Sequence, residues 1–179
     1  NKCNVVACMA GPSRIEVHNA LLTASELAAR RGGLQPRRET RPSTIDGGAR
    51  LDLAFLFGNM LWLLDFAVTS HMRNARQAAT VAGGAATEYE RVKFARYSSV
   101  LPPGSRLIPV VCDTLGAWGS CAAEPLDAIA RAYARSLGVG LAGAHMFYAI
   151  LNATLVRLVS RLLLQNSGVG ATLLTPHSE

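Results

Sequence analysis

The sequence is poor in charge, in closely spaced cysteines and in lysine, and each shortage excludes a class of protein. Only 17% of its 179 residues are charged and half are hydrophobic, a composition that excludes an intrinsically disordered chain. Its four cysteines are Cys3, Cys8, Cys112 and Cys121. Apart from the first pair they lie far apart, which excludes a disulfide-rich secreted scaffold and favours a reducing compartment. Internal repeats are also absent, so this length predicts one domain with its own core.

Lysine is the rarest of the charged residues. Of 18 basic residues only Lys2 and Lys93 are lysines, and the other 16 are arginines; with 12 acidic residues the formal charge is +6. The planar guanidinium group of arginine suits phosphates, so this balance is consistent with a nucleic-acid partner. The alternative is a GC-rich genome that encodes arginine where other genomes encode lysine. Composition does not choose between the two.

Residues 138–156 carry no formal charge, and this run is nearly long enough to span a bilayer. Arg157 and Arg161 follow the run at helical spacing, while His145 and Asn152 lie seven residues apart on one helical face. These polar residues favour a buried core helix over a membrane span. We therefore expect no membrane partner.

Hydrophobic periodicity predicts an α/β fold in which a small mixed sheet is flanked by helices. The predicted helices are 13–31, 85–99, 122–136 and 141–165, and the predicted strands are 50–57, 60–68 and 105–113. Gly58–Asn59 separates the first two strands and is typical of a hairpin turn. The second strand is apolar on both faces, which predicts a central position in the sheet.

Residues 34–48 form a polar, proline-containing segment that we expect to be a loop. The segment holds Arg37, Arg38 and Arg41 and is the most basic short stretch of the chain. It is either a solvated loop or a loop that contacts phosphates.

Two carboxylates stand inside the apolar hairpin, Asp52 in its first strand and Asp65 in its second. An ionised side chain in such a place is costly unless a partner or a cation compensates it. Neighbouring antiparallel strands bring the two acids to the same end or face only in the right register, which the sequence does not reveal. The next helix adds Glu90 and Lys93, three residues apart and so on one face, with Tyr97 one turn further along.

Two or three carboxylates beside a lysine match the needs of metal-assisted phosphodiester hydrolysis. The acids hold Mg²⁺ or Mn²⁺, the metal polarises the phosphate and activates a water, and the lysine orients that water or stabilises the developing charge. The alternative is purely structural, because acids at strand ends and Glu–Lys pairs on helix surfaces are common without any catalytic role.

The order of five short motifs resembles that of a known nuclease family. The motifs are "VHN" at 17–19, "RLD" at 50–52, "WLLDFAV" at 62–68, "EYERVKFARY" at 88–97 and "PVVCDTLGAWG" at 109–119. In this order the chain is similar to the restriction-like endonuclease domain of site-specific non-LTR retrotransposons, which belongs to the PD-(D/E)xK superfamily. The resemblance extends from residue 3 to about residue 165.

The resemblance implies a restriction-endonuclease-like α/β sandwich with extra C-terminal helices. It implies that Asp52 and Asp65 are metal ligands, that Glu90 assists them, and that Lys93 is the catalytic lysine with Tyr97 beside it. The expected nucleic-acid contacts are Arg14, His18, Asn19, Arg37, Arg38 and Arg41. His18 is alternatively an ordinary helix histidine.

The N-terminal residues 1–12 resemble a remnant of the zinc cluster of this family, ahead of a single domain at 13–166 and a tail at 167–179. Cys3 and Cys8 match only the second half of that cluster, and two thiolates make a poor zinc site, so we expect no zinc. Other departures are Leu51, where the family has proline, and Val17, where it has Arg or Lys. The chain begins at Asn1 without a methionine, which leaves open a preceding targeting segment or reverse transcriptase.

Two functions therefore remain open. The chain is a Mg²⁺-dependent endonuclease that nicks DNA, or it is a catalytically inert, domesticated relic that serves as a structural subunit of a larger assembly, such as a ribonucleoprotein or a mitochondrial complex. In the second case the predicted helix 141–165 supplies apolar surface for a protein partner. Either function places the protein in the nucleus or the mitochondrion.

Overall fold

The computed structural model describes residues 12–40, 50–70, 81–97 and 101–166 and contains one four-stranded sheet. The strands are β1 (Arg37–Thr40), β2 (Leu51–Phe57), β3 (Met60–Thr69) and β4 (Ser105–Asp113), in that order across the sheet. β1, β2 and β3 pair antiparallel, whereas β4 pairs parallel to β3. The sheet is therefore mixed, as predicted.

The predicted hairpin is confirmed. β2 and β3 pair from Leu53 opposite Leu64 to Phe57 opposite Met60, and the turn between them contains Gly58 with φ of +59°, a conformation that glycine adopts without strain. β3 lies between β2 and β4 and is buried without interruption from residue 62 to residue 66. Its apolar residues on both faces explain this central position.

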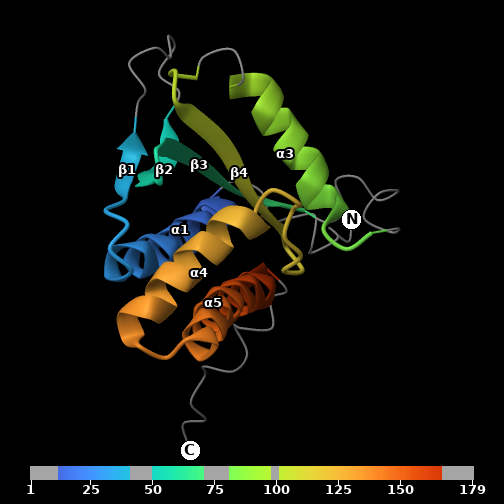
Figure 1. Ribbon diagram of the computed structural model, residues 1–179. Helices are drawn as coiled ribbons and strands as arrows, with labels where there is room; N and C mark the ends of the chain where they lie inside the picture. The colour runs from blue at the N-terminus through green and yellow to red at the C-terminus, as the bar shows by residue number, and fades with distance from the viewer. Residues whose placement is uncertain (1–11, 41–49, 71–80, 98–100, 167–179) are drawn as a thin grey trace, which may run out of the picture.

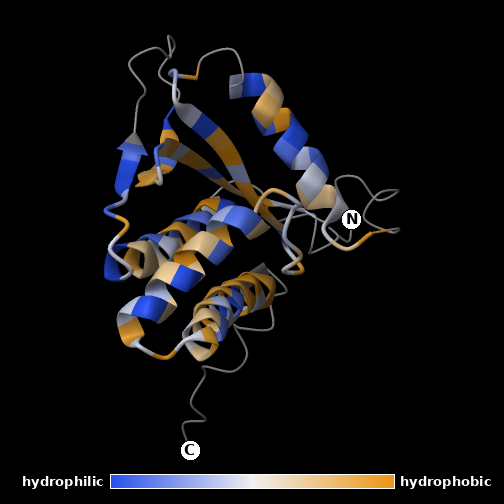
Figure 2. Ribbon diagram, viewed as in Figure 1, coloured by the Kyte–Doolittle hydropathy of each residue, from blue (hydrophilic) through white to orange (hydrophobic). Residues whose placement is uncertain are grey.

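Helices cover both faces of the sheet, which confirms the α/β sandwich (Figure 1). α1 (Pro12–Arg31), α4 (Ala123–Leu137) and α5 (Leu141–Asn166) pack against one another on one face. α3 (Gly84–Tyr97) packs on β3 and β4 from the other face. Figure 2 shows the apolar stretches of β3, β4 and α5, whereas polar and apolar residues are mixed along α3.

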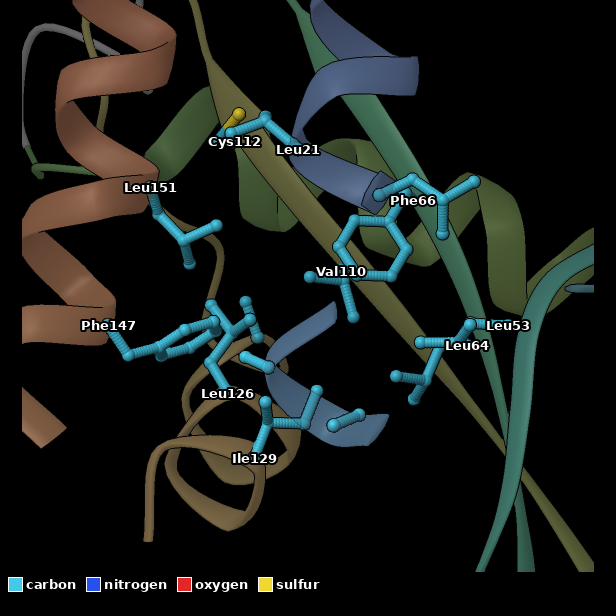
Figure 3. Packing of buried hydrophobic residues seen from close by; sticks show 14 of the residues in the cluster. Leu21, Leu53, Leu64, Phe66, Val110, Cys112, Leu126, Ile129, Phe147 and Leu151 are labelled. Carbon is cyan, nitrogen blue, oxygen red and sulfur yellow. The ribbon is translucent and has the colours of Figure 1, made fainter. Parts of the chain in front are cut away.

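The main core lies between the sheet and the three helices α1, α4 and α5. It is made of side chains that share near-complete burial and come from every one of these elements, as Figure 3 shows: Leu21, Leu53, Leu64, Phe66, Val110, Leu126, Ile129, Phe147 and Leu151. A smaller cluster lies under α3 and contains Leu51, Ala54, Leu63, Tyr97 and Leu107. Each buried aliphatic or aromatic side chain contributes about 1.5–3 kcal/mol, so both layers are held mainly by apolar burial.

Two glycines allow the three helices on one face to approach closely. A Cβ on Gly32, just after α1, would lie 2.7 Å from the Cβ of Ala132 in α4. A Cβ on Gly143, in the first turn of α5, would lie 2.7 Å from the Cα of Ala134. The end of α1, the end of α4 and the start of α5 therefore meet at one place.

The expectation of a loop throughout residues 34–48 holds for residues 34–36 but was wrong for residues 37–40. Residues 37–40 form the edge strand β1, whereas residues 41–49 lie outside the described residues. The side chains of residues 37–39 are exposed, so this strand has no apolar alternation that could reveal it in the sequence. Ion pairs hold it instead: Arg38 pairs with Glu26 of α1, and Glu39 lies 2.9 Å from Arg50.

The long helix α5 has an inner face in the core and an outer face that is largely exposed. Phe147, Leu151 and Leu155 are at most 2% exposed, whereas Leu141 and Val156 are 78% and 62% exposed. Within the described part of the chain, Leu141–Leu164 is the one helix long and apolar enough to cross a membrane by length and composition, and 33% of its most apolar window is buried. The inner face of α5 belongs to the core, as the sequence predicted. The absence of a membrane partner stays a prediction.

Candidate functional site

A cleft of about 430 Å³ opens where the first turns of α1, the parts of β2 and β3 just beyond their paired residues, and the middle of α3 come together. Its lining consists of Arg14, Ile15, His18, Asn19, Asp52, Asp65, Phe66, Ala67, Val68, Tyr89 and Lys93. Four different elements, α1, β2, β3 and α3, thus contribute the polar side chains. We refer to this site as the acid–lysine cleft.

Asp65 and Lys93 form a close ion pair at the base of the cleft. Asp65 Oδ2 lies 2.7 Å from Lys93 Nζ, and the two side chains are 5% and 15% exposed. Alternation along β3 directs Asp65 toward the face that α3 covers, while its neighbours Leu64 and Phe66 enter the main core. Burial tends to lower the pKa of Lys93, but the charge of Asp65 and its hydrogen bond raise it overall, so the ammonium group is retained at neutral pH.

Asp52, at the start of β2, forms hydrogen bonds with α1 and with β3. Its Oδ2 atom accepts hydrogen bonds from His18 Nε2 (3.0 Å) and from the backbone N–H of Phe66 (2.7 Å). The regular β2–β3 pairing stops at Leu53 opposite Leu64, so the carboxylate takes the place of the next strand acceptor. Continued by one residue, the same register would place Asp52 opposite Asp65.

His18 has an acceptor oxygen on each side of its ring. Nε2 faces Asp52, and Nδ1 lies 3.0 Å from Asn19 Oδ1. Burial tends to lower the pKa of His18, but the hydrogen bond and charge of Asp52 outweigh it and raise the pKa above 6.5. The cationic imidazolium, which donates from both nitrogens, is thereby favoured.

The two carboxylates interact electrostatically. Burial raises the pKa of Asp65, and the negative charge of Asp52 raises it further, against the opposing charges of Lys93 and His18. The like charges of these two carboxylates, which line the same cleft, favour a bound cation between them. The predicted convergence of Asp52, Asp65 and Lys93 on one cleft is therefore present in the geometry.

Tyr97 lies beneath the cleft instead of on its wall. It is 4% exposed and belongs to the small apolar cluster under α3. Burial raises its pKa, and the charge of Asp65 adds to this shift, so the phenol lies within electrostatic reach of the acid. Tyr89 lines the cleft instead, and its ring centroid is 5.7 Å from Lys93 Nζ. The spacing of four residues between Tyr89 and Lys93 is the signal that could have predicted it.

Glu90 is directed away from the cleft, toward the start of α4. It is 1% exposed; its carboxylate accepts hydrogen bonds from the backbone N–H of Cys121 (3.1 Å) and from Ser120 Oγ (3.1 Å). These donors lie just before α4, where backbone N–H groups lack helical partners. Gly119 fits beside them because it has no Cβ: a Cβ there would lie 2.2 Å from Glu90 Oε1. Glu90 therefore holds the turn that precedes α4, a place that the predicted assistance to the metal ligands did not foresee.

The predicted arginine contacts do not gather at one place. Arg14 lines the cleft one helical turn before His18. Arg38 donates hydrogen bonds to Glu26 and Thr23 of α1. Arg37 lies beside Arg30 at the edge of the sheet. Arg41 lies outside the described residues.

The side chains in the cleft fit a hard divalent cation better than zinc. Mg²⁺ prefers oxygen ligands and is commonly held by one or two carboxylates, with waters and substrate phosphates completing its shell. Asp52 and Asp65 supply such a pair. Over the described ranges, the structure holds no group of three or more His, Cys, Asp and Glu side chains that could enclose a metal. Cys3 and Cys8, the candidates for a zinc remnant, lie outside those ranges.

Comparison with known proteins identifies no family for this chain. No protein-family model matches it, and no curated protein matches it. The resemblance to retrotransposon nucleases consequently stays a prediction.

Proposed function

We propose that this chain is a Mg²⁺-dependent endonuclease domain that binds and nicks DNA, related to the restriction-like endonucleases of site-specific non-LTR retrotransposons. The observation that carries the proposal is the cleft itself, where Asp52, Asp65 and Lys93 come together from two strands and a helix. Residues 13 and 41 positions apart in the sequence are thus gathered around one open space, the arrangement that phosphodiester hydrolysis needs.

In this proposal Asp52 and Asp65 hold the cation. When bound, Mg²⁺ polarises a phosphate oxygen and lowers the pKa of a coordinated water. Lys93, whose raised pKa keeps it cationic, stabilises negative charge that develops on the phosphate. The burial of its partner Asp65 fixes the position of the ammonium group, so little reorganisation is needed when the substrate enters.

The α1 side of the cleft supplies further positive charge toward a nucleic acid. Arg14 and His18 lie one turn apart on this wall, and the charge of Asp52 favours the protonated form of His18. Asn19 is exposed beside them and offers an amide for hydrogen bonding. These three side chains contact the DNA backbone in this proposal, while the acids and lysine act on the scissile phosphate.

A plasmid-nicking assay tests the proposal. Purified protein is incubated with supercoiled DNA and Mg²⁺ or Mn²⁺, with EDTA as the metal-free reaction. We expect Asp65→Asn to reduce the rate of nicking by at least about 10³-fold, because the metal loses a charged ligand. The matched control is Asp127→Asn in α4, a half-exposed acid that accepts a hydrogen bond from Tyr148, which we expect to nick at the wild-type rate. Wild-type nicking by a folded Asp65→Asn protein would reject the assignment.

A second candidate function is that of an inert structural subunit. It is favoured by the fact that both carboxylates already have protein partners: Asp65 pairs with Lys93, and Asp52 accepts from His18 and Phe66. The exposed apolar side chains of α5 would then serve a protein partner. Absence of nicking with either metal, in a protein that is folded, supports this candidate. A protein that is monomeric and soluble alone by light scattering counts against it.

A further inference from the structure

A second hollow, of about 520 Å³, lies between α1 and α5 and begins where the acid–lysine cleft ends. Asn19 lines both, so the two adjoin at this residue. We call this hollow the α1–α5 groove. Its floor contains Ala24 and Ala28 of α1 and Phe147 of α5, and Tyr133 of α4 closes its far end.

The two helices that form the groove run in opposite directions. Glu16 in the first turns of α1 lies 2.5 Å from Arg161 near the end of α5, whereas Gly32 and Gly143 mark the place where the end of α1 and the start of α5 meet α4. Arg157 therefore lies at the cleft end of the groove and Arg31 at the far end. The 12 residues from Asn19 to Arg31 correspond to about 18 Å along α1.

The walls of the groove combine exposed apolar side chains with positive charge. Leu27 is 55% exposed and Ile150 is 42% exposed, on opposite sides of the groove. Arg31 and Arg157 are both exposed at its ends. Its lining contains arginines but neither Asp nor Glu. The groove thus matches an elongated ligand that has apolar faces along its length and negative charge beside them.

We propose that the α1–α5 groove holds a short single-stranded segment of the nucleic acid whose duplex part enters the acid–lysine cleft. The bases lie against the apolar floor and walls, and backbone phosphates lie near Arg31 and Arg157. At about 3.4 Å per stacked nucleotide, 18 Å accommodates roughly five nucleotides. A duplex hides its base faces by stacking and gains nothing from an apolar floor, so the single strand fits better. The inference rests on the proposed function for the identity of the substrate.

Fluorescence anisotropy with two labelled DNAs tests the inference. One is a blunt duplex, and the other is the same duplex with a five-nucleotide single-stranded extension; the free pentanucleotide serves as a third probe. We expect the extension to tighten binding to the wild-type protein. Arg31→Gln removes one phosphate contact and is expected to weaken binding of the extended DNA by about fivefold at 0.1 M salt and to reduce the salt slope by about 0.7.

Two further variants separate the groove from general charge. Ala24→Leu fills the floor and is expected to abolish the gain from the extension while leaving blunt-duplex binding unchanged. The matched control Arg135→Gln removes an exposed arginine of α4 that does not line the groove, and it is expected to bind both DNAs like the wild type. Thermal unfolding verifies the fold of each variant; Arg31→Gln, at an exposed helix end, decides the question if Ala24→Leu does not fold.

The outcomes distinguish this inference from the proposed function. If the wild-type protein nicks DNA but the extension adds no affinity, the groove inference is wrong and the nuclease proposal stands. If no nicking occurs but the extension still tightens binding and Ala24→Leu abolishes this gain, the groove binds single strands without catalysis. Equal loss in Arg31→Gln and Arg135→Gln shows binding by net charge alone and overturns the inference. Binding of an acidic peptide but of no DNA probe would assign the groove to a protein partner and overturn it as well.

Discussion

Two buried carboxylates, Asp65 of β3 and Glu90 of α3, show how partners decide what an acid can do. Burial raises the pKa of both. Asp65 is compensated by one cationic side chain, Lys93, and borders an open cleft. Glu90 is compensated by the backbone N–H of Cys121 and the hydroxyl of Ser120 in a closed place. Glu90 is thus held in place for structure, whereas Asp65, paired with one cation beside the cleft, is able to exchange that partner for a ligand.

The comparison also explains why one helix serves two sites. Lys93 and Glu90 lie three residues apart, and such residues point about 60° apart around a helix. Lys93 therefore reaches the sheet at Asp65, while Glu90 reaches the turn before α4. α3 joins the cleft to the start of α4 through these two side chains.

The largest effect is expected from breaking the ion pair of the cleft. Asp65→Leu leaves the ammonium group of Lys93 buried without its partner, at a cost of about 3–5 kcal/mol in the free energy of unfolding. In the double variant Asp65→Leu/Lys93→Met, two apolar side chains replace the pair, and we expect most of this loss to be recovered. Urea unfolding measures both. An equal loss in the single and double variants would show that the pair is not the source of the cost.

Removal of the Glu90 carboxylate is expected to have the next largest effect on stability. Glu90→Ala leaves the N–H of Cys121 and the hydroxyl of Ser120 without their acceptor, which costs about 1–3 kcal/mol. Because this carboxylate does not line the cleft, any nicking rate measured below the unfolding transition should match the wild type. Loss of nicking without loss of stability would place Glu90 among the residues that serve the cleft and would remove the contrast with Asp65.

The sequence predicted most of the architecture because its signals are local. Apolar periodicity located the four helices that the described residues form, and the turn at Gly58–Asn59 located the hairpin. The edge strand β1 was not predicted because its short polar sequence has no buried face. The ion pair of Arg38 with Glu26, residues twelve positions apart, helps to hold it. Such pairing over distance leaves no periodic trace.

The candidate site was predictable in composition but only partly in geometry. The cost of burying Asp52 and Asp65 in apolar strands marked them as residues that need partners, and the structure gives them His18 and Lys93. The direction of Glu90 was not readable, because a spacing of three residues allows one face or two. Its partner lies thirty residues further on, just after Gly119, whose lack of a Cβ is explained only by the packed structure.

Substitution of Gly119 is expected to have a smaller effect and tests its close contact with the Glu90 carboxylate. In the wild-type protein Gly119→Ala brings a methyl group into the space of the Glu90 carboxylate and is expected to cost about 1–2 kcal/mol through overpacking. In a Glu90→Ala background the same substitution meets an empty space, so we expect it to cost about 1 kcal/mol less. The double-mutant cycle from urea unfolding measures this coupling. Costs that add independently would mean that Gly119 is required for its backbone and not for the acid beside it.

The smallest effect is the pH dependence that Glu90 imparts to stability. Burial raises its pKa in the folded protein above 4.5, against the opposing hydrogen bonds from Cys121 and Ser120. The folded state thus binds the proton more tightly than the unfolded state, so the stabilisation from this proton is fully present below pH 4.5 and is lost as the pH rises through the folded pKa. Glu90→Gln keeps an acceptor oxygen but does not titrate. We therefore expect wild-type stability, measured relative to Glu90→Gln by urea unfolding, to fall as the pH rises from 4 to 7. A difference that stays constant over this range would show that the hydrogen bonds from Cys121 and Ser120 cancel the effect of burial on the pKa of Glu90.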